Sequence, residues 1–350
     1  MQKYETTLGE IFMHILHRHP EIEITEEMLS RKGNVHLIRE LGQLHKDRIF
    51  YIIRRKQKTA GLLSYYFTAL SHIRYAIERN WTPIVDLSDA YYPLVHENEA
   101  ESGNVNGWDN YFLQPTTFTA KDVIHASNVI ISDRLAWNHR YVIDQFEFER
   151  SPDLTLWKSI AKIYARIRPS IQYEMDNVFE QLFEPGSKIL GINFRKGYNL
   201  QRPSNHGVQP DEQTVFKDAE SLFTSGEYTH VFLSTEDFTV IEFFSKRFGS
   251  CLKYIDRPRV NSKFPTKQIS DEWGALMREI IESDRTDQFM ESIKFDRAND
   301  RFLKNKEYLT EVYVLSKCTG IISARTGGML MAYLLKDGEF ANALHYDERY

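Results

Sequence analysis

Residues 188–199, Lys-Ile-Leu-Gly-Ile-Asn-Phe-Arg-Lys-Gly-Tyr-Asn, decide the fold that this sequence predicts. The apolar run at 189–194 is short and contains the small residue Gly191, a pattern typical of a buried strand in a parallel sheet. Two adjacent cations, Arg195 and Lys196, follow the run directly. Open α/β sheets bind ligands beyond the carboxyl ends of their strands, and a guanidinium grips phosphate-like anions with two parallel hydrogen bonds. The stretch therefore indicates an anion site at a strand end. The alternative is an ordinary strand that runs out into a solvated basic turn.

Composition limits the class of protein. The chain has 350 residues, which suits two domains, and its 42% hydrophobic and 27% charged residues are typical of a soluble globular protein. A net charge of −5 argues against a chain-wide role in nucleic-acid binding but permits a local basic cleft. Two cysteines without metal-ligand spacing fit a reducing compartment, so we expect a cytoplasmic protein. We expect no signal peptide and, because no apolar run reaches ~20 residues, no transmembrane span.

The first 47 residues predict a helical leader. Apolar residues recur there at helical spacing in two runs, Leu8, Ile11, Phe12 and Ile15, and then Leu37, Leu41 and Leu44. Such a segment could lie on a membrane surface or bind a partner, so peripheral membrane association stays open. The alternative, a helix packed on its own domain, is favoured because interspersed glutamates dilute the positive charge.

Residues 48–185 predict a first α/β domain. A strand at Arg48–Arg54 is followed by a turn, by a helix that Gly61 opens and that runs to about Asn80, and by a strand at Pro83–Asp86. This order is the βαβ signature of a doubly wound domain. Free backbone N–H groups at the start of the helix could meet an anion or sugar hydroxyls. Farther on we expect a strand from Val123 to Ile131 and helix over 154–178 with an interruption near Pro169. A domain boundary is expected at the Glu-Pro-Gly-Ser turn of 184–187.

The aromatic and polar segment 87–115 lies within this domain. A loop of that length is usually functional, and tryptophan interleaved with aspartate and asparagine suits a carbohydrate surface. Ordinary packing is the alternative. The acceptor-binding candidates here and nearby are Gly61, Asp86, Asp89, Trp108 and Asp109.

Residues 186–350 repeat the alternation of strands and helices. After the strand at 189–194 we expect strands at 230–234, 251–255 and 320–323, and helices at 215–225, 239–248, 271–298, 307–317 and 329–335. The last strand empties into Ala-Arg-Thr-Gly-Gly at 324–328, ahead of a helix. Such a small-residue turn is a good phosphate cradle. The sequence contains neither a Walker A loop nor a Gly-x-Gly-x-x-Gly fingerprint.

Three stretches of this half resemble, in order, motifs of the fucosyltransferase superfamily of GT-B fold, which comprises the α1,2- and α1,6-fucosyltransferases and the protein O-fucosyltransferases. Residues 191–198 are similar to its Gly-x-His-x-Arg-Arg-Gly/Thr-Asp stretch, and residues 231–237 to its strand ending in Ser/Thr-Asp-Asp. Residues 311–328 resemble the helix and strand before its serine-rich turn, and residues 58–86 its glycine-opened first helix and second strand. Together these stretches cover much of residues 48–340.

The sequence departs from the family pattern at several positions. Asn193 stands where the family usually has histidine, Lys196 where it has a second arginine, and Tyr198 where it has aspartate. Gly327 and Gly328 replace bulkier polar residues. Arg195, which matches the arginine that the family uses on the donor pyrophosphate, is retained. The resemblance thus supports a sugar-nucleotide glycosyltransferase better than it supports fucose or guanosine in particular.

The resemblance implies an α/β, GT-B architecture in which two Rossmann-like domains, 48–185 on the acceptor side and 186–350 on the nucleotide-sugar side, face a cleft. It implies an inverting enzyme that uses a GDP-sugar as co-substrate and a glycan as acceptor. We expect no metal, because no Asp-x-Asp motif follows a strand, and no other cofactor. The predicted donor site comprises Asn193, Arg195, Lys196, Glu236, Asp237, Arg325, Thr326, Gly327 and Gly328.

The roles within this site differ. Arg195 and Lys196 would stabilise the leaving diphosphate, which makes Arg195 a catalytic residue, and the turn before Gly328 would add N–H donors. Glu236 or Asp237 could accept hydrogen bonds from ribose or base, although Asp237 also suits the N-cap of the next helix. The catalytic base is left open among loop residues; these are Asp211 and Glu212, with His206, Asp86 and Asp89 as alternatives.

Two other functions compete with this interpretation. A non-catalytic sugar-nucleotide or glycan-binding protein, derived from such a transferase, would explain the residues that depart from the family pattern. A nicotinamide oxidoreductase is disfavoured by the missing glycine fingerprint.

Overall fold

The computed structural model describes residues 37–55, 61–88, 106–118, 120–132, 143, 147–195, 210–259 and 295–347. The chain divides into two compact units. Unit 1 comprises Met1–Ile143, Thr155–Pro169 and Asp296–Asn305, and unit 2 comprises Asp144–Leu154, Ser170–Phe295 and Lys306–Tyr350. Each unit has its own sheet, which confirms the prediction of two α/β halves.

In the described part of unit 1, four strands form a sheet in the order β1-β4-β2-β3. They are β1 (Leu37–Arg39), β2 (Phe50–Ile53), β3 (Thr82–Val85) and β4 (Val129–Ile131). Strand β2 pairs in parallel with both β3 and β4, whereas β1 pairs with β4 in the antiparallel sense. Because β2 and β3 are parallel neighbours joined by a helix, the predicted βαβ unit is confirmed.

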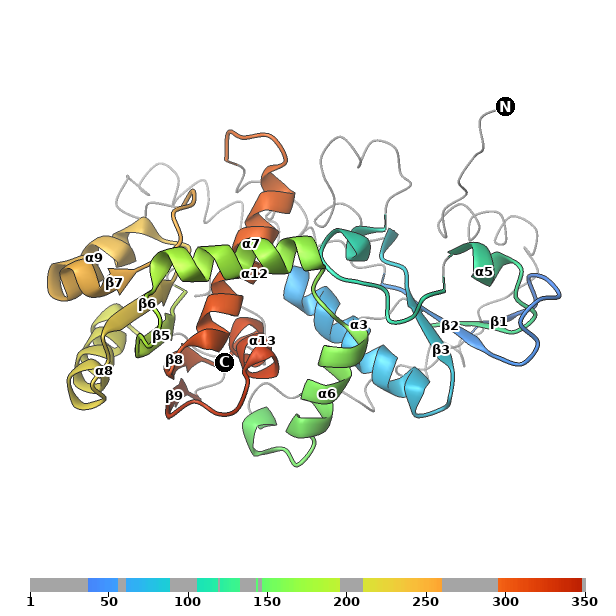
Figure 1. The fold of residues 1–350 in the computed structure, drawn as a ribbon, viewed down its shortest axis with the longest axis horizontal. Coiled ribbons are helices and arrows are strands. Elements are labelled where there is room, and N and C mark those ends of the chain that lie inside the picture. Colours follow the sequence, from blue (N-terminus) through green and yellow to red (C-terminus); the bar gives the residue numbers. More distant parts are fainter. Residues whose placement is uncertain are drawn as a thin grey trace, which may run out of the picture. The chain divides into compact units, whose positions relative to one another are not determined.

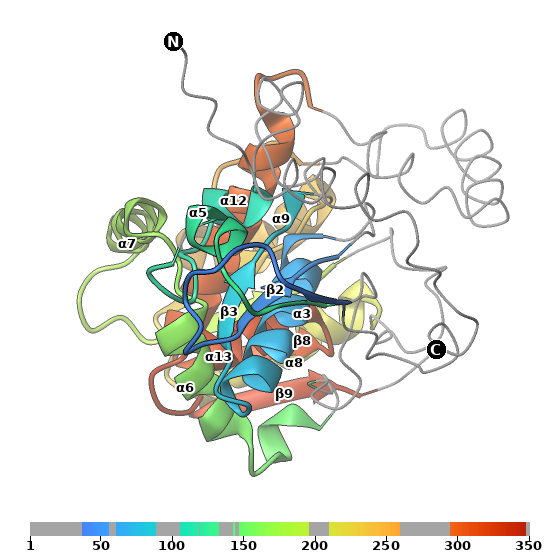
Figure 2. The same ribbon diagram turned by 90° about the vertical axis from the view of Figure 1, so that its right-hand side faces the viewer.

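Helix α3 (Leu62–Ile77) makes that connection and is buried around nearly all of its surface. Figure 2 shows it beside β2 and β3. Its polar His72 is buried too, and the ring Nδ1 is 2.8 Å from the hydroxyl of Tyr51 on β2. The further elements that lie wholly or mostly in this unit are η2 (Gly107–Asn110), α5 (Ala120–Ile124) and α6 (Leu154–Tyr164).

Two predictions in this half need correction. The leader was expected to be helical as far as residue 47, but Leu37–Arg39 is a strand whose backbone pairs with Val129–Ile131. The helical spacing of Leu37, Leu41 and Leu44 therefore does not mark a helix, and Leu44 is more than half exposed. Residues 1–36 lie outside the described ones. The expected strand from Val123 to Ile131 is also shorter, because the short helix α5 takes up its first residues and only β4 is extended.

The sheet of unit 2 is entirely parallel, with the order β7-β6-β5-β8-β9. Its strands are β5 (Ile189–Asn193), β6 (His230–Ser234), β7 (Leu252–Lys253), β8 (Gly320–Ala324) and β9 (Asn342–Tyr346). The apolar run at 189–194 contains the central strand β5, and every residue of β5 is buried. The expected strands of this half are thus confirmed, and β9 is an additional one.

Helices cover both faces of this sheet. Leu190 and Ile192 of β5 pack in one core with α8 (Glu212–Ser225) and α9 (Phe238–Phe248), which lie together in Figure 1. The intervening Gly191 faces α12 (Asp300–Lys317). A side chain there would meet Cys318 and Leu315 at 2.9 Å, so glycine lets the helix approach the strand closely. The remaining elements are α7 (Pro169–Leu182), α13 (Gly327–Leu335), η4 (Phe148–Arg150) and η5 (Gly249–Cys251).

The domain limits at residues 47 and 185 stay a prediction, and the two units divide the chain differently. Helix α7 precedes residue 185, yet from Ser170 onward it belongs to unit 2. The reason is its packing: the hydroxyl of Tyr313 on α12 donates to the carboxylate of Asp176 on α7, and Phe183, just after α7, lies against Phe232 of β6. Among the described residues no helix is long and apolar enough to span a bilayer.

Candidate active site

The carboxyl ends of β5, β6 and β8 meet at one edge of the parallel sheet of unit 2. Asn193, the last residue of β5, is in register with Ser234 on β6 and with Ser323 on β8. The three motifs singled out in the sequence therefore follow three neighbouring strands. The structure brings most of the predicted donor residues to this edge, where open α/β sheets bind their ligands.

Asn193 links two of the strand ends. Its side-chain Nδ2 donates to Ser323 Oγ and to Thr326 Oγ1, both at 3.0 Å, and the residue is 2% exposed. Its Oδ1 is buried without a hydrogen-bond partner in the part of the chain that the structure describes. A buried carbonyl left in that state costs about 1–3 kcal/mol, so it is a strong acceptor for a ligand hydroxyl or N–H group.

The turn after β8 forms the start of helix α13. Thr326 is its N-cap, and its hydroxyl oxygen accepts the N–H of Met329 at 3.2 Å. The first N–H groups of a helix, here those of Gly327 and Gly328, have no partner within the helix and can bind an anion. A side chain at Gly328 would lie 2.4 Å from the hydroxyl of Tyr308, so the backbone approaches α12 closely there.

Arg195 follows β5 and faces the end of β6. Its Nε is 3.5 Å from Oε2 of Glu236, and its guanidinium lies over the ring of Tyr308, 5.6 Å from the centroid. Burial lowers the pKa of Arg195, but the charge of Glu236 and the neighbouring Tyr308 outweigh this and raise it above the ordinary value. The side chain is 32% exposed, so a permanently charged guanidinium remains accessible to a ligand.

Two other donor-site predictions lie in different surroundings. Asp237 is buried and is the N-cap of α9, where its Oδ1 accepts the N–H of Thr239 at 2.8 Å. The capping alternative is thereby confirmed, and donor binding by Asp237 stays a prediction. Arg325 is 2% exposed and forms ion pairs with Glu149 and with Asp347, next to the end of β9. These two carboxylates neutralise the charge of the Arg325 guanidinium.

The candidate bases of unit 2 lie at the start of α8. Asp211 is its N-cap and accepts from the backbone N–H and the hydroxyl of Thr214, at 3.0 and 2.6 Å. These hydrogen bonds lower the pKa of Asp211, which makes it a weaker base. Glu212 is the first residue of the helix. Lys196 and His206, and Asp89 of the other unit, lie outside the described residues.

The acceptor-site candidates of unit 1 gather around the start of α3 and the end of β3. Gly61 precedes α3, and an added Cβ there would meet nothing within 4 Å, so packing does not require a glycine. Asp86 is fully buried beyond β3, with Arg54 Nε at 3.4 Å and the hydroxyl of Ser88 at 2.6 Å from its oxygens.

Trp108 and Asp109 lie in η2. Trp108 is 1% exposed, stacks on Tyr66 with ring centroids 6.0 Å apart, and donates from Nε1 to the carbonyl of Leu113. It is thus a core residue, because a sugar platform needs an open ring face. Asp109 accepts from Gln114 Nε2 at 2.7 Å, and burial raises its pKa to about 6 in spite of that hydrogen bond.

The sequence analysis missed a buried cluster beside the strand-end site. Glu311 of α12 is 0% exposed and accepts hydrogen bonds from Arg257, from Arg259 and from Ser234 Oγ. Both arginines also donate to the carbonyl of Thr235, after β6, at 3.1 Å. The Arg-Pro-Arg sequence shortly after a strand was the available signal.

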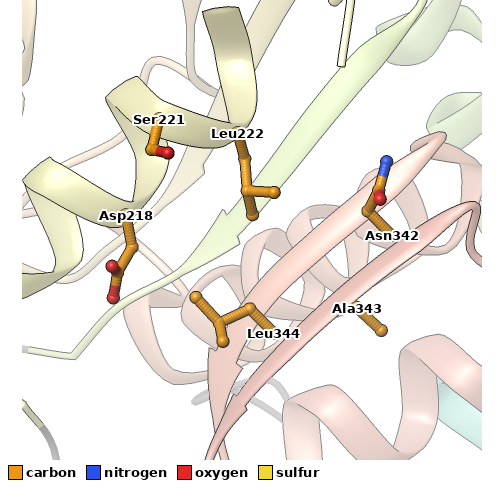
Figure 3. Close-up of a pocket in the computed structure, with 6 residues that line it drawn as sticks. All are labelled: Asp218, Ser221, Leu222, Asn342, Ala343 and Leu344. Atoms are coloured by element: carbon orange, nitrogen blue, oxygen red, sulfur yellow. The ribbon is translucent and has the colours of Figure 1, made fainter. Parts of the chain in front are cut away.

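A separate hollow of about 300 Å³ lies between α8 and the first half of β9. Figure 3 shows the side chains that line it, which are Asp218, Ser221, Leu222, Asn342, Ala343 and Leu344. None of the predicted site residues lines it. Among the described residues, no group of three or more histidine, cysteine, aspartate or glutamate side chains could hold a metal ion.

Comparisons with known proteins give structural matches only. No protein-family model matches the sequence, and no curated protein matches it. The structure is similar to that of NodZ alpha-1,6-fucosyltransferase, a Bradyrhizobium protein, with 14% identity, a TM-score of 0.47, and coverage of 83% of this chain and 93% of that chain. A mutant of Arabidopsis thaliana FUT1 matches with 10% identity and a TM-score of 0.46, over 95% of this chain and 78% of that chain. POFUT1 matches with 8% identity and a TM-score of 0.35, over 86% of this chain and 74% of that chain.

NodZ is a solved fucosyltransferase structure to which this chain is similar.

Proposed function

We propose that this protein is a glycosyltransferase that moves fucose, or a related sugar, from a GDP-sugar to a glycan acceptor by single displacement without a metal ion. The observation that carries the proposal is the meeting of Asn193 and Arg195 from β5, Glu236 after β6 and the start of α13 after β8 at three adjacent parallel strand ends. The choice of GDP and fucose follows from the sequence motifs that resemble the fucosyltransferase superfamily.

The chemistry follows from what each group can do. A nucleoside diphosphate leaves with its negative charge on the phosphate oxygens. Arg195 would stabilise that charge, and the N–H groups of Gly327 and Gly328 would add hydrogen bonds. Glu236, which now faces Arg195, would exchange this contact for one to the nucleoside as the diphosphate takes its place. Asn193 Oδ1 would accept a donor hydroxyl. Positive charge placed where negative charge develops commonly supplies several kcal/mol of transition-state stabilisation.

The acceptor hydroxyl must lose a proton in this reaction. We propose Glu212 ahead of Asp211 for this step, because the hydrogen bonds that cap α8 lower the pKa of Asp211. The Glu212→Gln and Asp211→Asn variants distinguish the two candidates. The variant that lacks the catalytic base should have a lower kcat and an unchanged affinity for GDP.

The direct test is turnover of GDP-fucose by the purified protein in the presence of EDTA. We expect slow release of GDP with water as acceptor, and loss of this activity in the Arg195→Ala variant. Binding of GDP-fucose without any turnover, across a panel of glycan acceptors, would instead identify a non-catalytic binding protein. A strict need for magnesium or manganese would contradict the metal-independent mechanism.

A further inference from the structure

Arg257 is a cation of the strand-end site that the sequence motifs do not mark. It lies after β7, and its guanidinium is held from two sides. Nε and Nη2 donate to the two carboxylate oxygens of Glu311 at 2.8 and 3.0 Å, and Nη2 also donates to the carbonyl of Thr235 at 3.1 Å. The third nitrogen, Nη1, makes no hydrogen bond to any residue that the structure describes. The side chain is 9% exposed.

Arg259, in contrast to Arg257, has a structural role in which all of its guanidinium nitrogens are hydrogen-bonded. Its three nitrogens donate to the carbonyls of Thr235, Arg257 and Ile255, and to Glu311, so every nitrogen is engaged, and the side chain is 3% exposed. Arg259 thus fixes the backbone of the loop that carries Arg257. Glu311 is thus a carboxylate that both guanidiniums contact.

Arg257 and Arg195 are held by neighbouring residues of α12 and of the segment after β6. Tyr308 and Glu311 are three residues apart on α12, so they lie on the same face of the helix, and Arg195 covers the ring of the first while Arg257 grips the second. Thr235, which accepts from Arg257, directly precedes Glu236, which faces Arg195. The two cations also interact electrostatically, because the charge of Arg257 acts to lower the pKa of Arg195.

We propose that Arg257 is a second phosphate-binding residue, which presents Nη1 to the diphosphate of a nucleotide ligand next to Arg195. The proposal rests on the function proposed above as far as the ligand is concerned. A diphosphate has two phosphate groups, so a second guanidinium near Arg195 gives each group a charged hydrogen-bond donor. Because Glu311 and Thr235 hold the guanidinium in place, binding costs little side-chain entropy.

The experiment is calorimetric titration of GDP and of inorganic pyrophosphate, separately, into wild-type protein and the Arg257→Gln variant at low ionic strength. We expect both ligands to bind the variant about tenfold more weakly or worse, as for the loss of a charge-assisted hydrogen bond. The matched control is Arg247→Gln, which removes an exposed guanidinium that pairs with Glu220 on the surface of the same unit. It should bind both ligands like the wild type.

Each outcome is decisive. Equal affinities of Arg257→Gln and wild type would overturn the proposal and leave the proposed function standing. Weaker binding of GDP with unchanged binding of pyrophosphate would also overturn the proposal, because Arg257 would then contact the nucleoside and not the diphosphate. If wild-type protein binds neither ligand, the proposed function fails as well. Where Arg257→Gln does not fold, the Arg257→Gln, Glu311→Gln double variant, which removes charge and counter-charge together, is titrated with the same expectations.

Discussion

Replacing Gly328 by alanine tests the packing that supports the strand-end site. The added Cβ would lie 2.4 Å from the hydroxyl oxygen of Tyr308, far inside van der Waals contact. A shift of the ring would disturb its contact with the guanidinium of Arg195, which lies 5.6 Å from the ring centroid. Overpacking of this kind costs about 1–3 kcal/mol. Alanine in a helix gains back up to about 1 kcal/mol over glycine. We therefore expect a net loss of about 1–2 kcal/mol in the free energy of unfolding, together with weaker binding of GDP.

The assay is urea unfolding of four proteins, namely wild type, Gly328→Ala, Tyr308→Phe and the double variant. Removal of the hydroxyl leaves the Cζ carbon of Tyr308 as the nearest ring atom, at 3.3 Å, which is tight but tolerable. The sign of the alanine effect should then reverse, so that the double variant is at least as stable as Tyr308→Phe alone. A double-mutant cycle isolates this coupling. The reasoning is refuted if Gly328→Ala has wild-type stability, or if its cost persists without the hydroxyl.

Three further outcomes are expected. Arg195→Ala should lose nearly all turnover with an unchanged melting temperature, and Arg195→Lys should be badly impaired too, because a point charge cannot form two parallel hydrogen bonds; activity close to wild type in either variant would remove this residue from the mechanism. Asp109→Asn should raise the melting temperature near pH 7 and leave it unchanged near pH 4. The folded state holds the Asp109 proton up to about pH 6, so its stabilising contribution is present below the unfolded pKa and is lost as the pH rises through 6; about two pKa units set an upper bound of about 3 kcal/mol. Gly191→Ala should destabilise unit 2 by about 1–3 kcal/mol in chemical unfolding, because its Cβ would lie 2.9 Å from atoms of Cys318 and Leu315; an unchanged midpoint would contradict the close packing of α12 on β5.

The elements that the sequence predicts well are those whose own residues decide their structure. The run 189–194 is buried along its whole length, and the helix after Gly61 carries a long apolar pattern, so both are found where they were expected. Strand β9 was missed because Asn342 and Ala343 are exposed at the edge of the sheet, so no buried run marks it. Strand β1 was taken for helix because its pairing with β4, some 90 residues later, decides its structure and the local spacing does not.

The candidate site was predictable where a motif ends a strand, as at Asn193, Arg195 and Thr326. It was not predictable where a partner distant in sequence decides what a side chain does. Arg257 and Glu311 are 54 residues apart and meet only in the folded chain. The residues around Trp108 in the sequence have the composition of a sugar-binding surface, but the stacking of Trp108 on Tyr66 places its ring in the core.

The strand order of unit 2 has a consequence for how the chain folds. Strand β5 has β6 on one side, which follows it closely, and β8 on the other, whose Ser323 lies 130 residues after Asn193. As the chain is synthesised, one edge of an apolar central strand therefore stays open until residues beyond Gly320 exist. Open apolar edges recruit other chains, and distant pairings form slowly. We expect docking of β8 to limit the folding rate of unit 2, and a chain that stops before residue 320 to aggregate. In unit 1, by contrast, the last of the described strands ends at Ile131.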